Sequence, residues 1–461
     1  MPEHQMPPNT HRDAAAMPGA QAATPSGWQL FRGEILHFLA DPGPATEGDA
    51  AHAFVHHTDG GLLLENGIVR RCGAWSEVAP AAPAGATWVD YSGRLILPGF
   101  VDTHIHYPQT DIIASPGRGL LDWLDRYAFP AERRFGDPAV AQEAAEFFCD
   151  ELLRNGTTTA LVFGTVHPQS VDALFGVALR RGLRIVAGKV MMDRNCPDFL
   201  RDTAQSSYDD SKRLIEGWHG TGRLGYAITP RFAATSTEEQ LAVAGALARE
   251  FPAVPVHSHV AENTAEVALI RELYPRSRSY LDVYDHYGLL KPHSVYAHGI
   301  YLDGNDRRRM AESATALSFC PSSNLFLGSG LLDLRAVIDS GVRVGIGSDV
   351  GGGTSFSLLR TLGAAYQVAH LNGYLMSPLQ AFYLATLAGA QALGLDAQIG
   401  NFAVGKEADF IVLDPAATPL LARRMGAAQS LAERLFLWMT LGDDRAVAAS
   451  HVMGTAQWER A

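Results

Sequence analysis

The chain has 461 residues, of which 47% are hydrophobic and 19% charged, and its formal net charge is −12. This composition is typical of a soluble globular protein, and the negative charge argues against a nucleic-acid backbone as a partner. No stretch approaches the ~18 apolar residues of a membrane-spanning helix, so we do not expect a membrane partner either. The four cysteines, Cys72, Cys149, Cys196 and Cys320, form no CxxC pair and are interpreted as reduced thiols of a cytoplasmic protein.

The two flanks of the chain differ from its middle. Residues 1–27 are rich in Pro, Ala and His and show no periodicity, so we interpret them as a disordered tail. Short strand-like runs, such as residues 28–38 and 61–69, then lie between clusters of Gly, Pro and Asp. A similar run at residues 410–413 follows a predicted turn near the C-terminus. We predict that residues 28–95 and 400–461 pair into one small composite β domain.

Between the flanks, short apolar runs alternate with segments of helical length. Residues 138–155 have helical spacing and end in Asn155-Gly156, and residues 237–250 follow Ser236, a predicted N-cap. Eight buried strands separated by helices are the pattern of a (β/α)₈ barrel, so we predict an α/β fold with a TIM-type barrel over residues 96–399. The eight runs are residues 95–101, 158–163, 184–191, 224–229, 254–258, 294–297, 316–319 and 342–347.

Histidines and an aspartate stand at the ends of four of these runs. The active site of such a barrel lies at the carboxyl ends of its strands, and residues two apart on one strand point to the same side. We therefore expect convergence of His104 and His106 on strand one, His259 on strand five, His298 on strand six and Asp349 on strand eight. Imidazole and carboxylate ligands suit zinc, and iron as well. The sequence predicts a metal site with room for a water.

Each of these residues also has a purely structural interpretation. His298 alone is typical of a packed core histidine, and Asp349 alone could cap the helix that follows it. His257 has the same parity as His259 and could share the rim of the pocket, but His259 is favoured because Glu262 follows it by one turn. The joint arrangement on four strands favours the metal site over coincidence.

This set of residues resembles the amidohydrolase superfamily, whose pattern is HxH on strand one, His on strands five and six, and Asp on strand eight. The flanking β segments resemble the composite β-sandwich of that superfamily. Strand four ends in Arg231 and carries no lysine that could be carbamylated to bridge two metals, and Lys189 lies inside the run of strand three. The resemblance therefore implies the mononuclear branch, which includes nucleobase and pterin deaminases, with one zinc ion per chain.

Within that branch, residues 90–415 resemble the guanine deaminase family. The motifs that carry the resemblance are HIHYPQ (104–109), WLDRYAFPAE (123–132), MDRN (192–195), TPRF (229–232) and SHVAE (258–262). The block at 123–132 is the most diagnostic, because the histidine and aspartate set is shared across the superfamily. The resemblance implies a homodimer that hydrolyses guanine to xanthine and ammonia in purine metabolism.

The predicted chemistry assigns a role to each polar residue. A metal ion lowers the pKa of its bound water to about 7, so hydroxide is available to attack C2 of guanine. Asp349 would bind the metal and accept a hydroxide proton, and Glu262 would carry a proton to a ring nitrogen and to the departing ammonia. A solvated glutamate at the start of a helix is the alternative interpretation of Glu262.

Substrate choice is predicted from hydrogen-bond polarity. Guanine O6 only accepts hydrogen bonds and Arg231 only donates them, whereas the amino group of adenine would meet a second donor. Gln109 offers both a donor and an acceptor to the ring edge. Phe232 is expected to stack on the purine or to pack in the core, Tyr107 to line the pocket wall, and Trp123 chiefly to pack in the core.

Two alternatives stay open at the level of sequence. The chain could be a sibling hydrolase that acts on 8-oxoguanine, a pterin or a triazine. It could also be a non-enzymatic scaffold barrel, although all five predicted ligands are present. The signature of cytidine deaminases is absent, because Cys320-Pro321 is not followed by a second cysteine.

Overall fold

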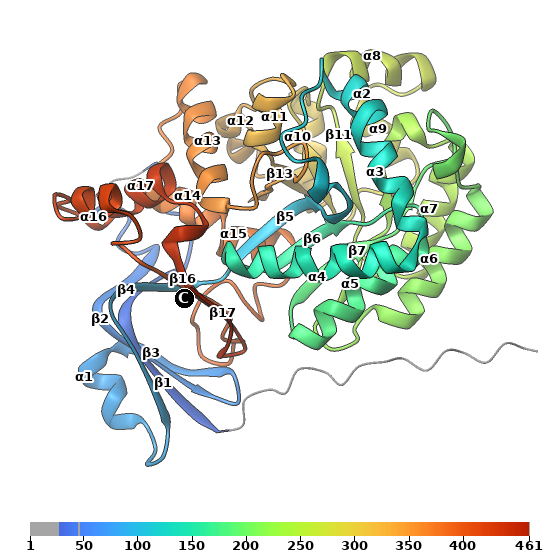
Figure 1. Ribbon diagram of the computed structural model, residues 1–461. Helices are drawn as coiled ribbons and strands as arrows, with labels where there is room; N and C mark the ends of the chain where they lie inside the picture. Colours follow the sequence, from blue (N-terminus) through green and yellow to red (C-terminus); the bar gives the residue numbers. More distant parts are fainter. Residues whose placement is uncertain (1–26, 45–46, 461) are drawn as a thin grey trace, which may run out of the picture.

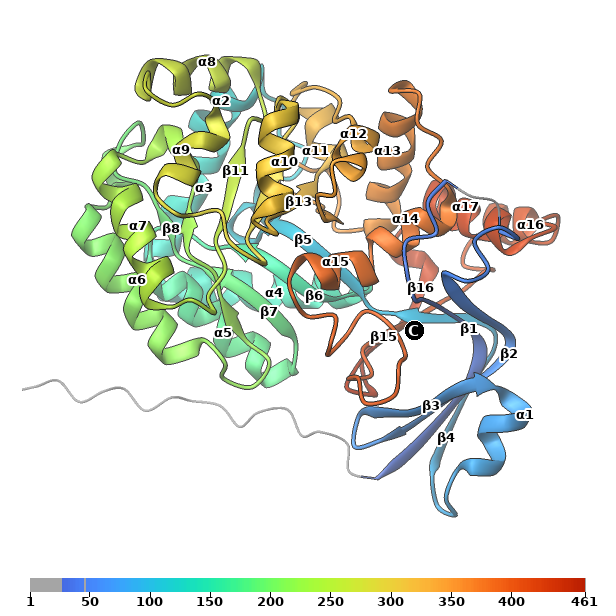
Figure 2. The same cartoon turned by 180° about the vertical axis from the view of Figure 1, so that it is seen from behind.

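Both ends of the chain contribute strands to one sheet of seven strands (Figures 1 and 2). The structure is a computed structural model that describes residues 27–44 and 47–460, so the predicted tail over residues 1–27 lies outside the described residues apart from Gly27. In order across the sheet, the strands are β17 (Thr455–Glu459), β16 (Val447–Val452), β15 (Phe410–Leu413), β4 (Thr87–Pro98), β1 (Trp28–Phe38), β2 (Phe54–Glu65) and β3 (Ile68–Ala74).

The C-terminal strands join this sheet through β15, which pairs antiparallel with β4. This confirms the predicted pairing of the run at 410–413 with the N-terminal strands. Phe31 and Leu62 from the first part of the chain share one buried cluster with Phe410 and Val412 from the last part. The C-terminal flank also contains two helices that the sequence did not reveal, α16 (Pro419–Met425) and α17 (Leu431–Leu441).

Between the flanks, parallel strands alternate with helices in a mixed α/β arrangement. The strands form two sheets of four and one pair. The first sheet contains β5 (Phe100–His106), β6 (Thr157–Phe163), β7 (Arg184–Gly188) and β9 (Gly225–Tyr226), and the second contains β11 (His257–Val260), β12 (Val295–His298), β13 (Ala316–Phe319) and β14 (Val344–Ile346). The pair is β8 (Val190–Met191) with β10 (Thr229–Pro230).

The connecting helices surround these strands on the outer side (Figure 1). Consecutive helices from α4 to α7 are in contact with one another. The segment between β5 and α4 is made of short helical turns: η2 (Tyr107–Ile112), α2 (Leu120–Trp123), η3 (Leu124–Ala128), α3 (Phe129–Arg133) and η4 (Arg134–Gly136). The longer connections are α4 (Pro138–Arg154), α5 (Pro168–Arg181), α6 (Ala204–Trp218), α7 (Glu238–Glu250), α8 (Thr264–Leu273), α9 (Tyr280–His286) and α10 (Gly304–Glu312). The last group is α11 (Pro321–Phe326), α12 (Leu334–Asp339), α13 (Leu358–Leu371), α14 (Pro378–Leu384) and α15 (Leu387–Ala392).

Local sequence signals explain the ends of the predicted helices. The Asp137 side chain accepts a hydrogen bond from Ala139 N at 2.9 Å, and Pro138 occupies the first turn of α4. The helix ends at Arg154, and its C-cap Asn155 precedes Gly156, which has φ 81°. The N-cap of α7 is Thr237 and not the predicted Ser236, because Thr237 Oγ1 accepts the hydrogen bond from Gln240 N.

The first predicted barrel strand is divided between two sheets. β4 ends at Pro98 in the seven-stranded sheet and β5 begins at Phe100, so the run at 95–101 is not one strand. Gly99 makes the change of sheet possible, because a Cβ atom there would lie 2.1 Å from Thr158 Oγ1. The sheet of the flanks therefore extends beyond the predicted limit at residue 95. In the part of the chain that the structure describes, no helix is long and apolar enough to cross a membrane.

Candidate active site

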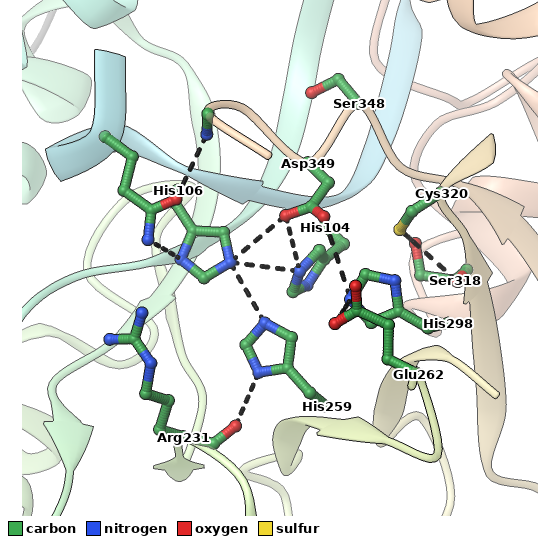
Figure 3. Close-up of polar contacts among 12 residues, drawn as sticks. His104, His106, Arg231, His259, Glu262, His298, Ser318, Cys320, Ser348 and Asp349 are labelled. Carbon is green, nitrogen blue, oxygen red and sulfur yellow. Dashed lines mark hydrogen bonds and ion pairs between the residues drawn. The ribbon is translucent and has the colours of Figure 1, made fainter. Parts of the chain in front are cut away.

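Four histidines and one aspartate converge at the carboxyl ends of parallel strands (Figure 3). His104 and His106 lie on β5, His259 lies on β11, His298 ends β12, and Asp349 follows β14. His106 Nε2 lies 3.2 Å from His104 Nε2 and 3.2 Å from His259 Nε2. Asp349 Oδ1 is 3.2 Å from His104 Nε2 and 3.4 Å from His106 Nε2. The structure thus brings together all the residues that the sequence predicts as ligands.

The donor set fits a metal ion such as zinc. The ligand atoms of His104, His259 and His298 all lie within 4.8 Å of one another. Each ligand atom of a zinc ion lies about 2 Å from the metal, so two ligand atoms are roughly 3 Å apart. Several donor atoms of this cluster have that separation. Asp349 Oδ2 also lies 3.8 Å from His298 Nε2. The residues therefore form a candidate metal site of nitrogen and oxygen donors.

Burial keeps three of these imidazoles neutral. Removal from water, followed by repulsion from neighbouring cationic groups, holds the pKa of His104, His106 and His259 well below the usual value. A neutral imidazole has the free lone pair that a metal ligand needs. Burial also opposes protonation of His298, but the carboxylates of Glu262 and Asp349 outweigh it and raise the His298 pKa.

The other ring nitrogen of three histidines is held by a specific partner. His259 Nδ1 donates to the backbone oxygen of Arg231 at 2.6 Å, and His298 Nδ1 donates to Asn324 Oδ1 at 2.8 Å. His104 Nδ1 lies 2.8 Å from His257 Nε2. Such contacts fix the tautomer and orientation of a ligating ring. His257 is therefore buried behind His104, and the interpretation that it shares the pocket rim is wrong.

Two of the converging residues have unusual backbone conformations. His298 has φ 72° and Asp349 has φ 51°, a left-handed region in which residues with a Cβ atom are uncommon. Such conformations persist only where the surrounding structure enforces them, and they concentrate at functional sites. Both residues lie where a strand of the second sheet ends, so the turn out of the strand directs each side chain toward the cluster.

A cavity opens above the cluster, and Glu262 lies in its wall. Glu262 Oε2 is 3.4 Å from His298 Nε2, and Glu262 Oε1 accepts a hydrogen bond from Ser329 Oγ at 2.7 Å. Burial raises the pKa of Glu262 despite the cationic influence of His298. A carboxyl group held in this way is suited to taking up and releasing a proton near the metal site.

The predicted substrate contacts, Gln109, Arg231 and Phe232, line the same cavity. Arg231 Nη1 donates to both carboxylate oxygens of Glu132, at 2.9 and 2.7 Å, and Gln109 Nε2 donates to Glu132 Oε1 at 3.0 Å. Sequence reasoning noted Glu132 only as the last residue of a motif. It missed the contact because Glu132 and Arg231 are far apart in the chain.

The structure also places Trp123, Tyr107 and Lys189, for which the sequence predicted roles in the pocket wall or in the core. Trp123 lines the cavity while its ring is buried. Tyr107 does not line it, because its ring packs against Phe135 and its hydroxyl donates to a backbone oxygen of α5. Lys189 is buried and paired with Asp202, which agrees with a structural role.

A strand–helix framework with a histidine and aspartate cluster at its strand ends is the architecture of a hydrolase superfamily. Residues 95–455 match the family model described as Amidohydrolase family. The chain therefore belongs to the amidohydrolase family.

Several relatives that are similar over most of the chain are guanine deaminases. The chain is 53% identical to Guanine deaminase from Escherichia coli (strain K12) over 402 residues, which cover 87% of this chain and 92% of that protein. The solved structure of the E. coli enzyme superposes with a TM-score of 0.91 at 50% identity, covering 94% of this chain and 100% of that one. The structure of guanine deaminase from C. acetobutylicum, with guanine bound in its active site, gives a TM-score of 0.83 at 27% identity and covers 93% of this chain and 100% of that one.

These comparisons confirm the resemblance that the motifs carry. An adenosine deaminase from Xanthomonas campestris with bound zinc is also similar, with a TM-score of 0.81 at 22% identity over 94% of this chain and 93% of that one. At that identity the likeness concerns the fold alone. The shared framework agrees with the mixed α/β architecture described above.

Proposed function

We propose that the protein catalyses the hydrolytic deamination of guanine to xanthine and ammonia. The observation that carries the proposal is the pairing of two features in one cavity: the histidine and aspartate cluster on its floor and the donor groups of Arg231 and Gln109 on its wall. The similarity to guanine deaminases over most of the chain supports the same reaction.

The residues proposed to hold one zinc ion are His104, His106, His259, His298 and Asp349. When bound, the metal would supply a water nucleophile at neutral pH. Cys320 also lies close to His104 and Asp349, but burial raises the pKa of its thiol well above the usual value. Iron is the alternative metal, because it accepts the same ligands.

In this proposal, guanine is recognised through the hydrogen-bond donors and acceptors along the edge of its ring. Arg231 donates to O6 and Gln109 contacts the neighbouring ring edge, while Phe232 stacks on the purine face. Arg231 also holds the metal site, because its backbone oxygen accepts the hydrogen bond from His259 Nδ1. Arg231 thus contacts both the proposed substrate and a proposed metal ligand. This favours a fixed distance between the purine ring and the metal ion.

Protons are proposed to move through Glu262 and Asp349. The attacking water supplies the two protons that the reaction consumes: Glu262 carries one to a ring nitrogen beside C2, and the other passes from Asp349 through Glu262 to the amino group, which then leaves as ammonia and not as an amide anion. The hydrogen bond from Ser329 to Glu262 keeps one carboxylate oxygen in place. Asp349 accepts a proton of the attacking water. Both carboxyl groups follow strand ends, next to the position at which C2 of the substrate would lie in this proposal.

We infer that the parallel sheets close into one (β/α)₈ barrel. Ile228 pairs with Val256, which joins the two four-stranded sheets on one side. On the other side, Asp349 N donates to His104 O and His106 N donates to Val350 O, both at 2.9 Å. The division into a barrel over residues 96–399 and a composite β domain from residues 28–95 and 400–461 stays a prediction. The cytoplasmic location and the homodimer are predictions as well.

The test is conversion of guanine by the purified protein, read as xanthine formation and ammonia release, with metal content measured on the same sample. We expect turnover and about one zinc or iron ion per chain. A protein that holds about one metal ion and leaves guanine unchanged contradicts the proposed substrate. A stoichiometry near two contradicts the mononuclear site.

A further inference from the structure

Glu132 is a buried carboxylate that touches both side chains proposed to read the substrate. It lies on α3, and its side chain is 1% exposed, as against 2% for Arg231. One carboxylate thus receives two hydrogen bonds from Arg231 Nη1 and one from Gln109 Nε2. A buried carboxylate that accepts three hydrogen bonds is well satisfied, and the ion pair is removed from solvent screening.

The contact with Glu132 balances the charge of Arg231. A buried guanidinium without a partner is a strong site for an anion, because it binds a carboxylate or phosphate through two parallel hydrogen bonds. Glu132 already supplies the opposite charge. Both hydrogen bonds to Glu132 use Nη1, so that carboxylate leaves Nε and Nη2 unengaged. The wall can therefore offer donors to an uncharged acceptor without attracting an anion.

The contact with Glu132 also fixes the orientation of Gln109. Gln109 Nε2 donates to Glu132, and Gln109 Oε1 accepts a hydrogen bond from Gly351 N at 3.2 Å. Since Glu132 only accepts and the backbone amide only donates, rotation of the amide by 180° would place like groups against each other. The amide therefore presents one defined order of donor and acceptor to the cavity.

We propose that Glu132 is the positioning residue that sets the charge preference of this pocket: it neutralises Arg231 and orients Gln109, so that the site accepts an uncharged purine with a carbonyl group and rejects an anionic one. The inference rests on the proposed function and deepens it. Three other carboxyl groups line the cavity, those of Glu262 and Glu266 on its wall and of Asp349 on its floor, but Glu132 is the one that bonds both Arg231 and Gln109 among these four.

The experiment compares wild type with Glu132→Gln, using guanine as substrate and purine-6-carboxylate as an anionic probe. In E132Q, Arg231 keeps its charge without a counter-charge. We expect the dissociation constant of the probe, measured by calorimetry, to fall at least about tenfold, and KM for guanine to rise more than kcat falls, with metal content unchanged. If a metallated E132Q binds the probe no better than wild type, the proposal is wrong.

Glu34→Gln is the matched control, because it removes the carboxylate of another part-buried ion pair, Glu34 with Arg434, which lies outside the cavity. E34Q should leave probe binding and guanine kinetics unchanged. An E34Q variant that also gained affinity for the probe would contradict the assignment to Glu132, since general loosening would then explain the gain.

A double variant keeps the inference testable if E132Q alone does not fold. E132Q/R231Q removes both charges, so it should fold even where E132Q does not, or melt at a higher temperature where both fold, and it should show no gain in affinity for the probe. A double variant less stable than E132Q would contradict the charge balance. Wild-type turnover of guanine tests the proposed function separately, because the probe-binding comparison does not depend on catalysis.

Discussion

The floor and the wall of the cavity are built by different means. The floor consists of residues on or directly after parallel strands, and neutral groups hold its histidines: a backbone oxygen for His259, Asn324 for His298 and His257 for His104. The wall depends on an ion pair between Arg231 after β10 and Glu132 on the short helix α3. In the proposed function, the reaction is carried by residues of the strands, while the residues proposed to select the substrate are supported from a connecting segment.

The largest expected effect comes from breaking the floor. His298→Ala removes one proposed ligand and leaves Asn324 without its partner, so most of the metal and the activity should be lost together. Metal analysis and guanine kinetics on the same preparation measure both. A H298A protein with full metal content would show that His298 is not a ligand.

The next effect separates proton transfer from metal binding. Glu262→Gln keeps the size of the side chain and an oxygen that can accept from Ser329, but it cannot carry a proton. Metal content and folding should be unchanged, while kcat falls by about 10²–10⁴-fold and KM changes little. A fully metallated E262Q enzyme within about tenfold of wild type would rule out proton transfer by Glu262.

An effect of intermediate size is expected on the wall. Arg231→Ala keeps the backbone oxygen that holds His259, so the metal should stay. Loss of a charged hydrogen bond in a buried site costs about 3 kcal/mol, which lowers kcat/KM for guanine by about 10²-fold. Normal turnover of guanine by R231A would make Arg231 structural and remove the main support for the substrate.

Most of the site residues that the sequence predicts line the cavity on both floor and wall, whereas Asn324 and Glu132, which it does not reveal, hold such residues from behind. His104 and His106 were found because residues two apart on a strand share a face, and His298 and Asp349 because they follow apolar runs. Asn324 and Glu132 were not recognised, because each acts across a distance in the chain that no periodic pattern records. Gly99 was also missed, since only the three-dimensional contact with Thr158 shows why the strand must divide there.

The smallest effect is expected for Asn324, which contacts His298 on the side away from the cavity. Asn324→Ala removes the acceptor for His298 Nδ1 without changing the cavity wall that is proposed to bind guanine. Metal affinity should fall by about tenfold, because outer partners of this kind tune affinity by 10- to 100-fold. Competition with a chelator measures the change, and KM for guanine in excess zinc should stay close to wild type. A chelator titration identical to wild type would show that the contact does not orient His298.

The most direct test of the account is a substrate panel on the fully metallated wild-type enzyme, with ammonia release as the readout. Guanine, 8-oxoguanine, adenine, cytosine, a pterin and a triazine would be compared by kcat/KM. If the wall selects a carbonyl acceptor while the floor supplies the chemistry, guanine should exceed adenine by at least about 10²-fold. Equal kcat/KM values for guanine and adenine, or a triazine turned over faster than guanine, would contradict it.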